Sequence, residues 1–196
     1  MQLVEWVAAI LSAVSVYLSA RENIWSWPLA IVSVTMYGFV FIGAGLYSDA
    51  GLQVFFGAIS IYGWYEWLHG GPRHGKLRVS RATARAWLIA AVFGAAFWFT
   101  LGSITSRLQG VSLPFLDAGL TTVSVIAQIM MTRKILENWI LWIAVDVVYV
   151  PVYAYKNLYP TAVLYAVFLV LAVMGFVQWK RSLARGQPTP PPGSPA

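Results

Sequence analysis

Long apolar runs separated by short polar stretches fill almost the whole sequence. A helix needs about 20 mainly apolar residues to cross a bilayer. By that criterion the pattern predicts seven spans, at about 3–20, 24–43, 50–68, 85–105, 114–132, 138–156 and 159–178. The sequence therefore predicts an all-α membrane protein, with no room for a separate soluble domain.

Within several spans, polar and aromatic side chains recur three or four residues apart, which places them on one helix face. The faces are Trp139, Trp142, Asp146, Tyr149 and Tyr153 in the sixth span; Asp117, Thr121, Ser124 and Gln128 in the fifth; and Gln53, Ser60 and Trp64 in the third. Because polar groups are costly in lipid, we expect these faces to point into the helix bundle.

Asp146 lies near the centre of the sixth span, where an aspartate costs roughly 2.5–3.5 kcal/mol on insertion scales. All 13 lysines and arginines lie in loops or at span ends, so we expect no fixed internal counter-ion. Three interpretations remain open. The carboxylate could face a cationic substrate held by the flanking aromatic rings, join two helices by a hydrogen bond, or bind a proton or ion.

The sequence also matches itself after a shift of 112 residues, which aligns 1–67 with 113–179 with 14 identities in 67 positions. The matched pairs include Arg21 and Arg133, Trp27 and Trp139, Tyr37 and Tyr149, Gly63 and Gly175, and Trp67 and Trp179. Each copy would hold three spans, and the fourth span between them puts both copies in the same membrane orientation. Transporters are commonly built from such repeats, with the substrate site where the repeats meet.

The polar residues of the spans are largely not repeated, and four of them show this. Their partners at the 112-residue shift are apolar or aromatic: Val34 for Asp146, Tyr165 for Gln53, Val16 for Gln128 and Ala172 for Ser60. A duplicated scaffold with unduplicated polar groups suits one asymmetric substrate better than a symmetric ion pore.

Composition and charge agree with a membrane protein. The chain is 59% hydrophobic and 10% charged, with a mean hydropathy of +0.69, whereas soluble domains carry about 25% charged residues. On alternating sides of seven spans, one side holds Arg107 and Lys156 and the other holds the remaining 11 basic residues. The positive-inside rule places those 11 in the cytoplasm, with the N-terminus outside. The net charge of +6 thus indicates topology rather than nucleic-acid binding.

Other chemistry has little support in the residues. The absence of cysteine excludes disulfides and thiolate metal sites. His69 and His74 lie in a loop rich in glycine and are poor metal ligands, and no catalytic motif or retinal-binding lysine appears in the spans. We therefore expect no enzymatic activity, no metal and no cofactor.

Four stretches resemble the Pnu family of bacterial vitamin transporters over about residues 3–180: "ENIWSWPLAIVSVTMYG", "LYSDAGLQVFF", "SIYGWYEW" and "MTRKILENWILW". The resemblance implies a 3+1+3 fold that doubles the three-helix unit of the SWEET sugar transporters. It also implies a homotrimer in the bacterial inner membrane and facilitated diffusion of a vitamin, which a cytosolic kinase then traps by phosphorylation. The organisation expected is a first repeat at 1–67, a basic cytoplasmic loop and linker helix at 68–112, a second repeat at 113–179 and a disordered cytoplasmic tail at 180–196.

The family motifs and the polar faces together define the expected substrate-binding residues. They are Gln53, Ser60, Tyr62, Trp64, Gln128, Asn138, Trp139, Trp142, Asp146 and Tyr149. Members that take nicotinamide riboside, an NAD precursor, often carry asparagine where this chain has Ser33, Ser60 and Asp146. Nicotinamide riboside is the expected substrate; thiamine, also an aromatic cation, and neutral riboflavin are alternatives from other branches. A channel or a membrane adaptor without transport is an alternative of a different class.

The topology can be tested by single-cysteine labelling, since the native chain has no cysteine. We expect Ser80→Cys, in the basic loop, to be protected from an impermeant thiol reagent outside intact cells, and Ser106→Cys, on the opposite side, to react. Reaction of the cysteine at position 80 from outside would contradict the predicted orientation.

Overall fold

The chain folds into seven α-helices in a computed structural model that describes residues 2–43, 47–107, 113–155, 157 and 159–186. The elements are α1 (Gln2–Ala20), α2 (Ser26–Gly43), α3 (Tyr47–His69), a short 3₁₀ helix η1 (Pro72–His74), α4 (Ala84–Thr105), α5 (Pro114–Thr132), α6 (Asn138–Tyr155) and α7 (Tyr159–Gly186). They follow the seven predicted spans in order, because each apolar run is long enough to form one helix.

Five helices are long and apolar enough to cross a membrane on their own. These segments are Ser26–Gly43, Ala84–Thr105, Pro114–Thr132, Asn138–Tyr155 and Thr161–Arg185. The apolar part of α1, Trp6–Ala20, is shorter. The prediction of an all-helical membrane protein is confirmed, whereas membrane crossing by α1 and α3 stays a prediction.

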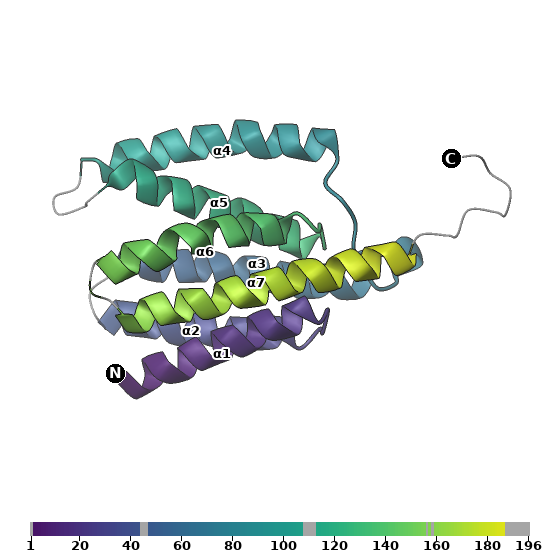
Figure 1. The fold of residues 1–196 in the computed structure, drawn as a ribbon, viewed down its shortest axis with the longest axis horizontal. Helices are drawn as coiled ribbons and strands as arrows, with labels where there is room; N and C mark the ends of the chain where they lie inside the picture. Colours follow the sequence, from purple (N-terminus) through teal and green to yellow (C-terminus); the bar gives the residue numbers. More distant parts are fainter. Residues whose placement is uncertain (1, 44–46, 108–112, 156, 158, 187–196) are drawn as a thin grey trace, which may run out of the picture.

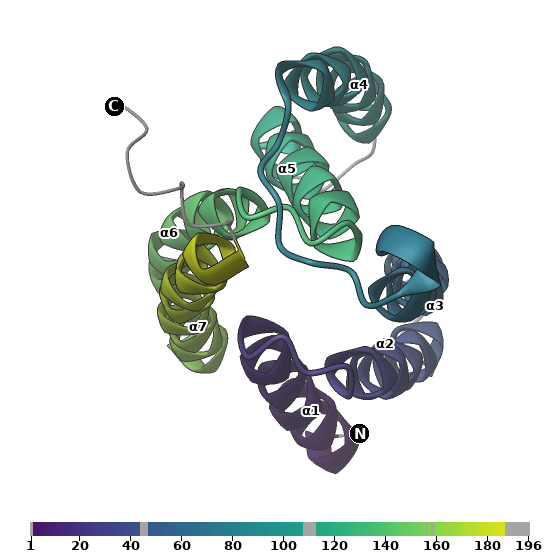
Figure 2. The same cartoon turned by 90° about the vertical axis from the view of Figure 1, so that its right-hand side faces the viewer.

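Six helices form a closed ring in the order α1, α2, α3, α5, α6 and α7, so that the first and last helices of the chain are neighbours (Figure 2). The remaining helix, α4, lies outside this ring and packs on α5 (Figures 1 and 2). Consecutive helices run in opposite directions (Figure 1). We call the end of the ring that carries the helix termini Ala20, Ser26, His69, Ala84, Thr132 and Asn138 the basic end.

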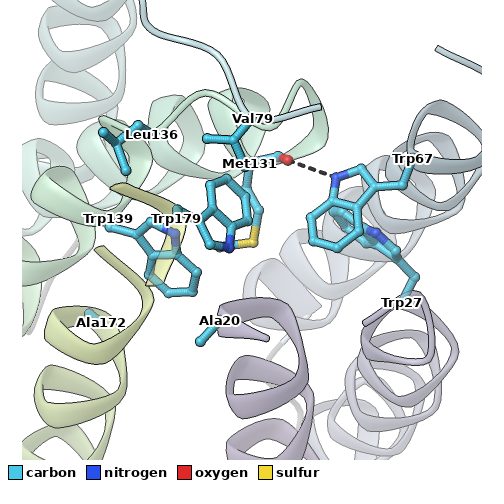
Figure 3. Packing of buried hydrophobic residues seen from close by; sticks show 9 residues of the cluster. All are labelled: Ala20, Trp27, Trp67, Val79, Met131, Leu136, Trp139, Ala172 and Trp179. Atoms are coloured by element: carbon cyan, nitrogen blue, oxygen red, sulfur yellow. Dashed lines mark hydrogen bonds between the residues drawn. The ribbon is translucent and has the colours of Figure 1, made fainter. Parts of the chain in front are cut away.

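Four tryptophans, which we call the tryptophan cluster, pack together at the basic end: Trp27, Trp67, Trp139 and Trp179 (Figure 3). Each is no more than 2% exposed. The Trp27 and Trp67 rings meet edge to face at 5.3 Å, as the Trp139 and Trp179 rings do at 5.4 Å. Trp67 and Trp179 join the two pairs at 5.8 Å. Edge-to-face contact is a favoured aromatic geometry, so the four rings form a continuous layer inside the ring of helices.

Two indole N–H groups of this cluster bond to main-chain carbonyls on other helices. Trp67 Nε1 of α3 donates to the Met131 carbonyl of α5 at 3.0 Å (Figure 3). Trp179 Nε1 of α7 donates to the Ser19 carbonyl of α1, also at 3.0 Å. Both acceptors lie in the last turn of a helix, where carbonyls run out of intrahelical partners. The donors are 112 residues apart in sequence, and so are the acceptors.

An ion pair lies at the same end. Lys134 Nζ is 3.1 Å from Glu22 Oε2 and 4.5 Å from the centroid of the Trp67 ring. Glu22 and Lys134 each have a positive φ, 54° and 49°, just after α1 and α5 end. These two positions are again 112 residues apart. Lys134 is only 6% exposed, and the pair joins the α1–α2 turn to the α5–α6 turn.

The basic loop between α3 and α4 is attached to the α5–α6 turn. Ser80 N–H donates to the Lys134 carbonyl at 3.0 Å, and Leu136 N–H donates back to the Ser80 carbonyl at 2.9 Å. Ala82 N–H donates to Glu137 Oε2 at 2.9 Å. Sequence reasoning identified this segment by its charge alone, since pairing between distant backbone groups leaves no local pattern.

The last helix is longer than the span predicted for it. Residues 180–186, expected to begin a disordered tail, continue α7 to Gly186. Arg185 lies in its last turn, where a positive charge interacts favourably with the helix dipole. The rest of the predicted tail, 187–196, lies outside the described residues.

Glycine in the third helix of each half lets a tryptophan pack directly on the backbone. A Cβ at Gly175 would lie 2.6 Å from the Trp139 ring, and one at Gly63 would lie 2.3 Å from the Trp27 ring. We expect Gly175→Ala to lower the melting temperature, with an overpacking cost of about 1–3 kcal/mol. Gly51→Ala is the matched control, since nothing lies within 4 Å of a Cβ there. Equal melting temperatures for the two variants would contradict the packing described.

Candidate functional site

All six helices of the ring line a cavity of about 250 Å³, which we call the central cavity. Trp27, Met131, Trp139 and Ala172 belong both to its lining and to the buried apolar cluster at the basic end. The tryptophan cluster therefore forms the wall of the central cavity on that side. Ligand pockets typically measure about 300–1,000 Å³, so the volume suits one small molecule.

Most lining residues come in pairs separated by 112 positions. The pairs are Val16 and Gln128, Ser19 and Met131, Trp27 and Trp139, Ala30 and Trp142, Val34 and Asp146, Phe56 and Phe168, and Ser60 and Ala172. In four of these pairs, a polar side chain from one half corresponds to an apolar one from the other. The two halves of the chain thus contribute corresponding positions to the cavity wall but different side chains.

Asp146 supplies the acidic group of the central cavity and is only 3% exposed. In the part of the chain that the structure describes, its carboxylate has no hydrogen bond and no ion pair. The buried Lys134 does not serve it, because that ammonium pairs with Glu22. The interpretation of Asp146 as a bond between helices therefore lacks a contact among the described residues.

Three indole groups leave donors unused at the cavity wall. The Nε1 atoms of Trp27, Trp139 and Trp142 are buried and have no acceptor among the described residues, and the Ser26 hydroxyl oxygen also lacks a partner there. All four residues line the central cavity. Because buried polar atoms are normally hydrogen-bonded, the site suits a ligand that carries hydrogen-bond acceptors together with a positive charge.

Serines form a hydroxyl-bearing wall between α1 and α2. Ser15 donates to the Ser26 carbonyl at 2.8 Å, and Ser33 donates to the Ala8 carbonyl at 2.9 Å. The hydroxyl oxygens of Ser12 and Ser33 are 2.6 Å apart. These bonds hold the two helices together and leave a mildly polar surface on this side of the cavity.

Away from the basic end, stacked tyrosines adjoin the cavity. The rings of Tyr149, Tyr153 and Tyr165 lie 4.8–5.4 Å apart. Tyr165 lines the central cavity, and Tyr149 packs behind it. The predicted site residue Tyr149 is therefore one ring away from the cavity.

The structure places five of the ten predicted site residues at the central cavity and five elsewhere. Those at the cavity are Ser60, Gln128, Trp139, Trp142 and Asp146. Those that do not line it are Gln53, Tyr62, Trp64, Asn138 and Tyr149. A binding role stays a prediction for both sets.

Three of the predicted residues that do not line the cavity have other surroundings. Tyr62 is 39% exposed and donates its hydroxyl to Glu66 Oε1 at 2.8 Å. Trp64 is 38% exposed. Asn138 is fully buried, and its Nδ2 donates to the Ile135 carbonyl at 2.6 Å at the start of α6. Tyr62 and Asn138 thus bond to nearby residues of their own helix or turn, and Trp64 is partly exposed on the surface.

Sequence reasoning did not propose several residues of the cavity wall. They are Ser12, Ser15, Ser19, Ser26, Trp27, Phe56, Tyr165 and Phe168. Two signals could have found some of them. Trp27 corresponds to Trp139 at the 112-residue shift, and Ser12, Ser15 and Ser19 have the spacing of one helix face.

Comparisons of the sequence with known proteins identify similar transporters. Residues 2–181 match the sequence model of the family described as Nicotinamide mononucleotide transporter. The nicotinamide riboside transporter PnuC of Escherichia coli K12 is 29% identical over 204 residues, covering 91% of this chain and 85% of that protein. The riboflavin/roseoflavin transporter RibM of Streptomyces davaonensis is 28% identical and covers 89% of this chain and 83% of its own length.

The fold has a counterpart among solved structures. The crystal structure of the vitamin B3 transporter PnuC superposes with a TM-score of 0.74 at 23% sequence identity, covering 94% of this chain and 83% of that chain. The arrangement of helices is therefore shared over nearly the whole length.

The lack of a bond to Asp146 among the described residues predicts how the protein responds to mutation without a ligand. Asp146→Asn removes a buried charge without breaking a described bond, so we expect an unchanged or higher melting temperature. Ser33→Ala is the comparison, because it breaks buried hydrogen bonds worth about 1 kcal/mol each. A loss of stability in Asp146→Asn as large as that in Ser33→Ala would restore the interpretation of Asp146 as a helix contact.

Proposed function

This chain belongs to the nicotinamide mononucleotide transporter family, and we propose that it carries nicotinamide riboside across the bacterial inner membrane by facilitated diffusion. One observation carries the choice of substrate. A buried carboxylate without a described partner, Asp146, shares a cavity with the rings of Trp27, Trp139 and Trp142. A cationic aromatic molecule supplies the charge that this site lacks.

Nicotinamide riboside matches the groups of the cavity one by one. Its pyridinium ring is positive, so it can pair with Asp146 and lie against tryptophan rings, which attract cations through their faces. Its carboxamide and ribose oxygens are acceptors for the unused indole N–H groups of Trp27, Trp139 and Trp142. The cavity volume, about 250 Å³, lies just below the usual range for ligand pockets, which also favours a compact vitamin.

Two other vitamins are alternatives that the same site ranks lower. Thiamine is also an aromatic cation and satisfies Asp146 equally, but it lacks ribose hydroxyls. Riboflavin is neutral and has three fused rings, so it neither balances the carboxylate nor suits a cavity of about 250 Å³. Riboflavin remains an alternative because the chain is similar to a riboflavin transporter.

The scaffold proposed for transport is a pair of three-helix repeats, 1–67 and 113–179, with α4 as the linker between them. The paired lining residues and the paired tryptophan contacts, each 112 positions apart, support it. We further propose a homotrimer, with the N-terminus outside and the C-terminus in the cytoplasm. Because facilitated diffusion alone only equalises concentrations, a cytosolic kinase that phosphorylates the vitamin would make uptake one-way.

The proposal is tested by ligand binding to the purified protein. A ligand that binds only the folded state raises the melting temperature. We expect nicotinamide riboside to raise it most, and thiamine and riboflavin less. Asp146→Asn should weaken nicotinamide riboside by roughly 1–3 kcal/mol, the scale of a hydrogen bond to a charged group, while its reduced dihydro form, whose ring is neutral, should bind almost as before.

Trp142→Ala serves as the control for contacts that do not depend on charge. Stacking area and exclusion of water are lost for both forms of the ligand, so both should weaken. Equal losses for the charged and neutral forms in Asp146→Asn would show that Asp146 is not the counter-ion. A larger shift with thiamine or riboflavin would change the vitamin but leave the family assignment unaffected.

A further inference from the structure

A second cavity, of about 760 Å³, lies at the basic end of the ring, and we call it the basic-end cavity. Its wall includes Glu22, Lys134 and Val79. Val79 also belongs to the buried apolar cluster, four other members of which, among them Trp27 and Met131, line the central cavity. The two cavities are therefore separated by the tryptophan cluster and the side chains packed on it.

Three polar contacts hold this barrier together, and each joins the first half of the chain to the second. Trp67 of α3 bonds to the Met131 carbonyl of α5, and Trp179 of α7 bonds to the Ser19 carbonyl of α1. The third is the ion pair between Glu22 and Lys134. Any movement of one half against the other at this end must break these contacts. Movements elsewhere in the ring leave them intact.

We propose that Trp67, Trp179 and the Glu22–Lys134 pair form the gate at the basic end, and that its opening joins the central cavity to the basic-end cavity. The proposal rests on the transport function proposed above, although its test does not require the vitamin to be known. The charged pair is suited to this place because it can exchange its internal partner for water when the barrier parts. The indole bonds are suited as well, since their acceptors, the Ser19 and Met131 carbonyls, belong to residues that line the central cavity, where water can bond to them once the barrier parts.

The gate is in direct contact with the candidate binding residues. The Trp27 ring packs edge to face on Trp67, and the Trp139 ring packs in the same way on Trp179. Trp27 and Trp139 line the central cavity, and their indole N–H groups have no acceptor among the described residues. A ligand that bonds to these indoles thus acts on the gate through a single ring contact on each side. Trp67 and Trp179 are positioning residues in this scheme, since they do not line the central cavity.

Accessibility of the central cavity from the basic end tests the gate. Ala30 lines the cavity, and the native chain has no cysteine, so Ala30→Cys is a single reporter. Membranes are exposed to a water-soluble maleimide on the side where a cysteine at Ser80 reacts. We expect Trp67→Phe and Trp179→Phe, which keep a ring but lose the N–H, to raise the labelling rate of the reporter about fivefold or more.

Trp98→Phe is the matched control for these variants. Trp98 Nε1 also donates to a main-chain carbonyl, that of Phe115 at 2.8 Å, but this bond joins α4 to α5 outside the ring. We expect the Ala30→Cys reporter to be labelled at the same rate with and without Trp98→Phe.

The ion pair has its own test. Glu22→Gln leaves the buried Lys134 without its partner and should raise the labelling rate, whereas Glu22→Lys combined with Lys134→Glu restores a pair and should return it to the parent value. A swap that labels as fast as Glu22→Gln would remove the ion pair from the gate.

Two outcomes separate this proposal from the proposed function. Parent-like labelling in folded Trp67→Phe and Trp179→Phe would overturn the gate and leave the transport function untouched. Increased labelling in a protein that binds none of the three vitamins would support the gate while contradicting the substrate.

Discussion

The closed ring depends on how its helices are joined at the basic end. In α1 and α5 the chain turns back just after the helix ends, at residues with positive φ. The indole bonds of Trp179 and Trp67 hold the last turns of those same helices. The glycines at 63 and 175 make room for the rings of Trp27 and Trp139, which pack edge to face on Trp67 and Trp179. The wall of the central cavity and the position of the buried ion pair follow from this arrangement.

The helices were predictable because each apolar run is long enough for one, and the tryptophan pairs were visible as an internal repeat. Which helix faces point inward was less predictable. In a soluble protein, the outside is polar and contrasts with the core, but a membrane helix is apolar on both sides. Trp64 is therefore as compatible with lipid as with a cavity, and its four-residue spacing from Ser60 did not place it inside.

Contacts between distant segments were not predictable at all. The bond from Trp67 to Met131 spans 64 residues, and neither residue type indicates the other. The attachment of Ser80 to the α5–α6 turn uses backbone groups that every residue has. Asp146 was the exception, because a lone carboxylate in an apolar span is costly enough to demand a cavity or a partner. The structure gives it a cavity.

The positions of Glu22 and Lys134 bear on how such a protein can arise. Two identical three-helix chains that paired symmetrically would place the same residue at both sites, and two like charges 3 Å apart repel each other. Opposite charges there require the two halves to be encoded separately, as they are in this single chain. The same reasoning applies to Asp146 and Val34: a symmetric pair would have carried two carboxylates or none. A single chain whose two halves differ in sequence can thus form a cavity with one negative charge.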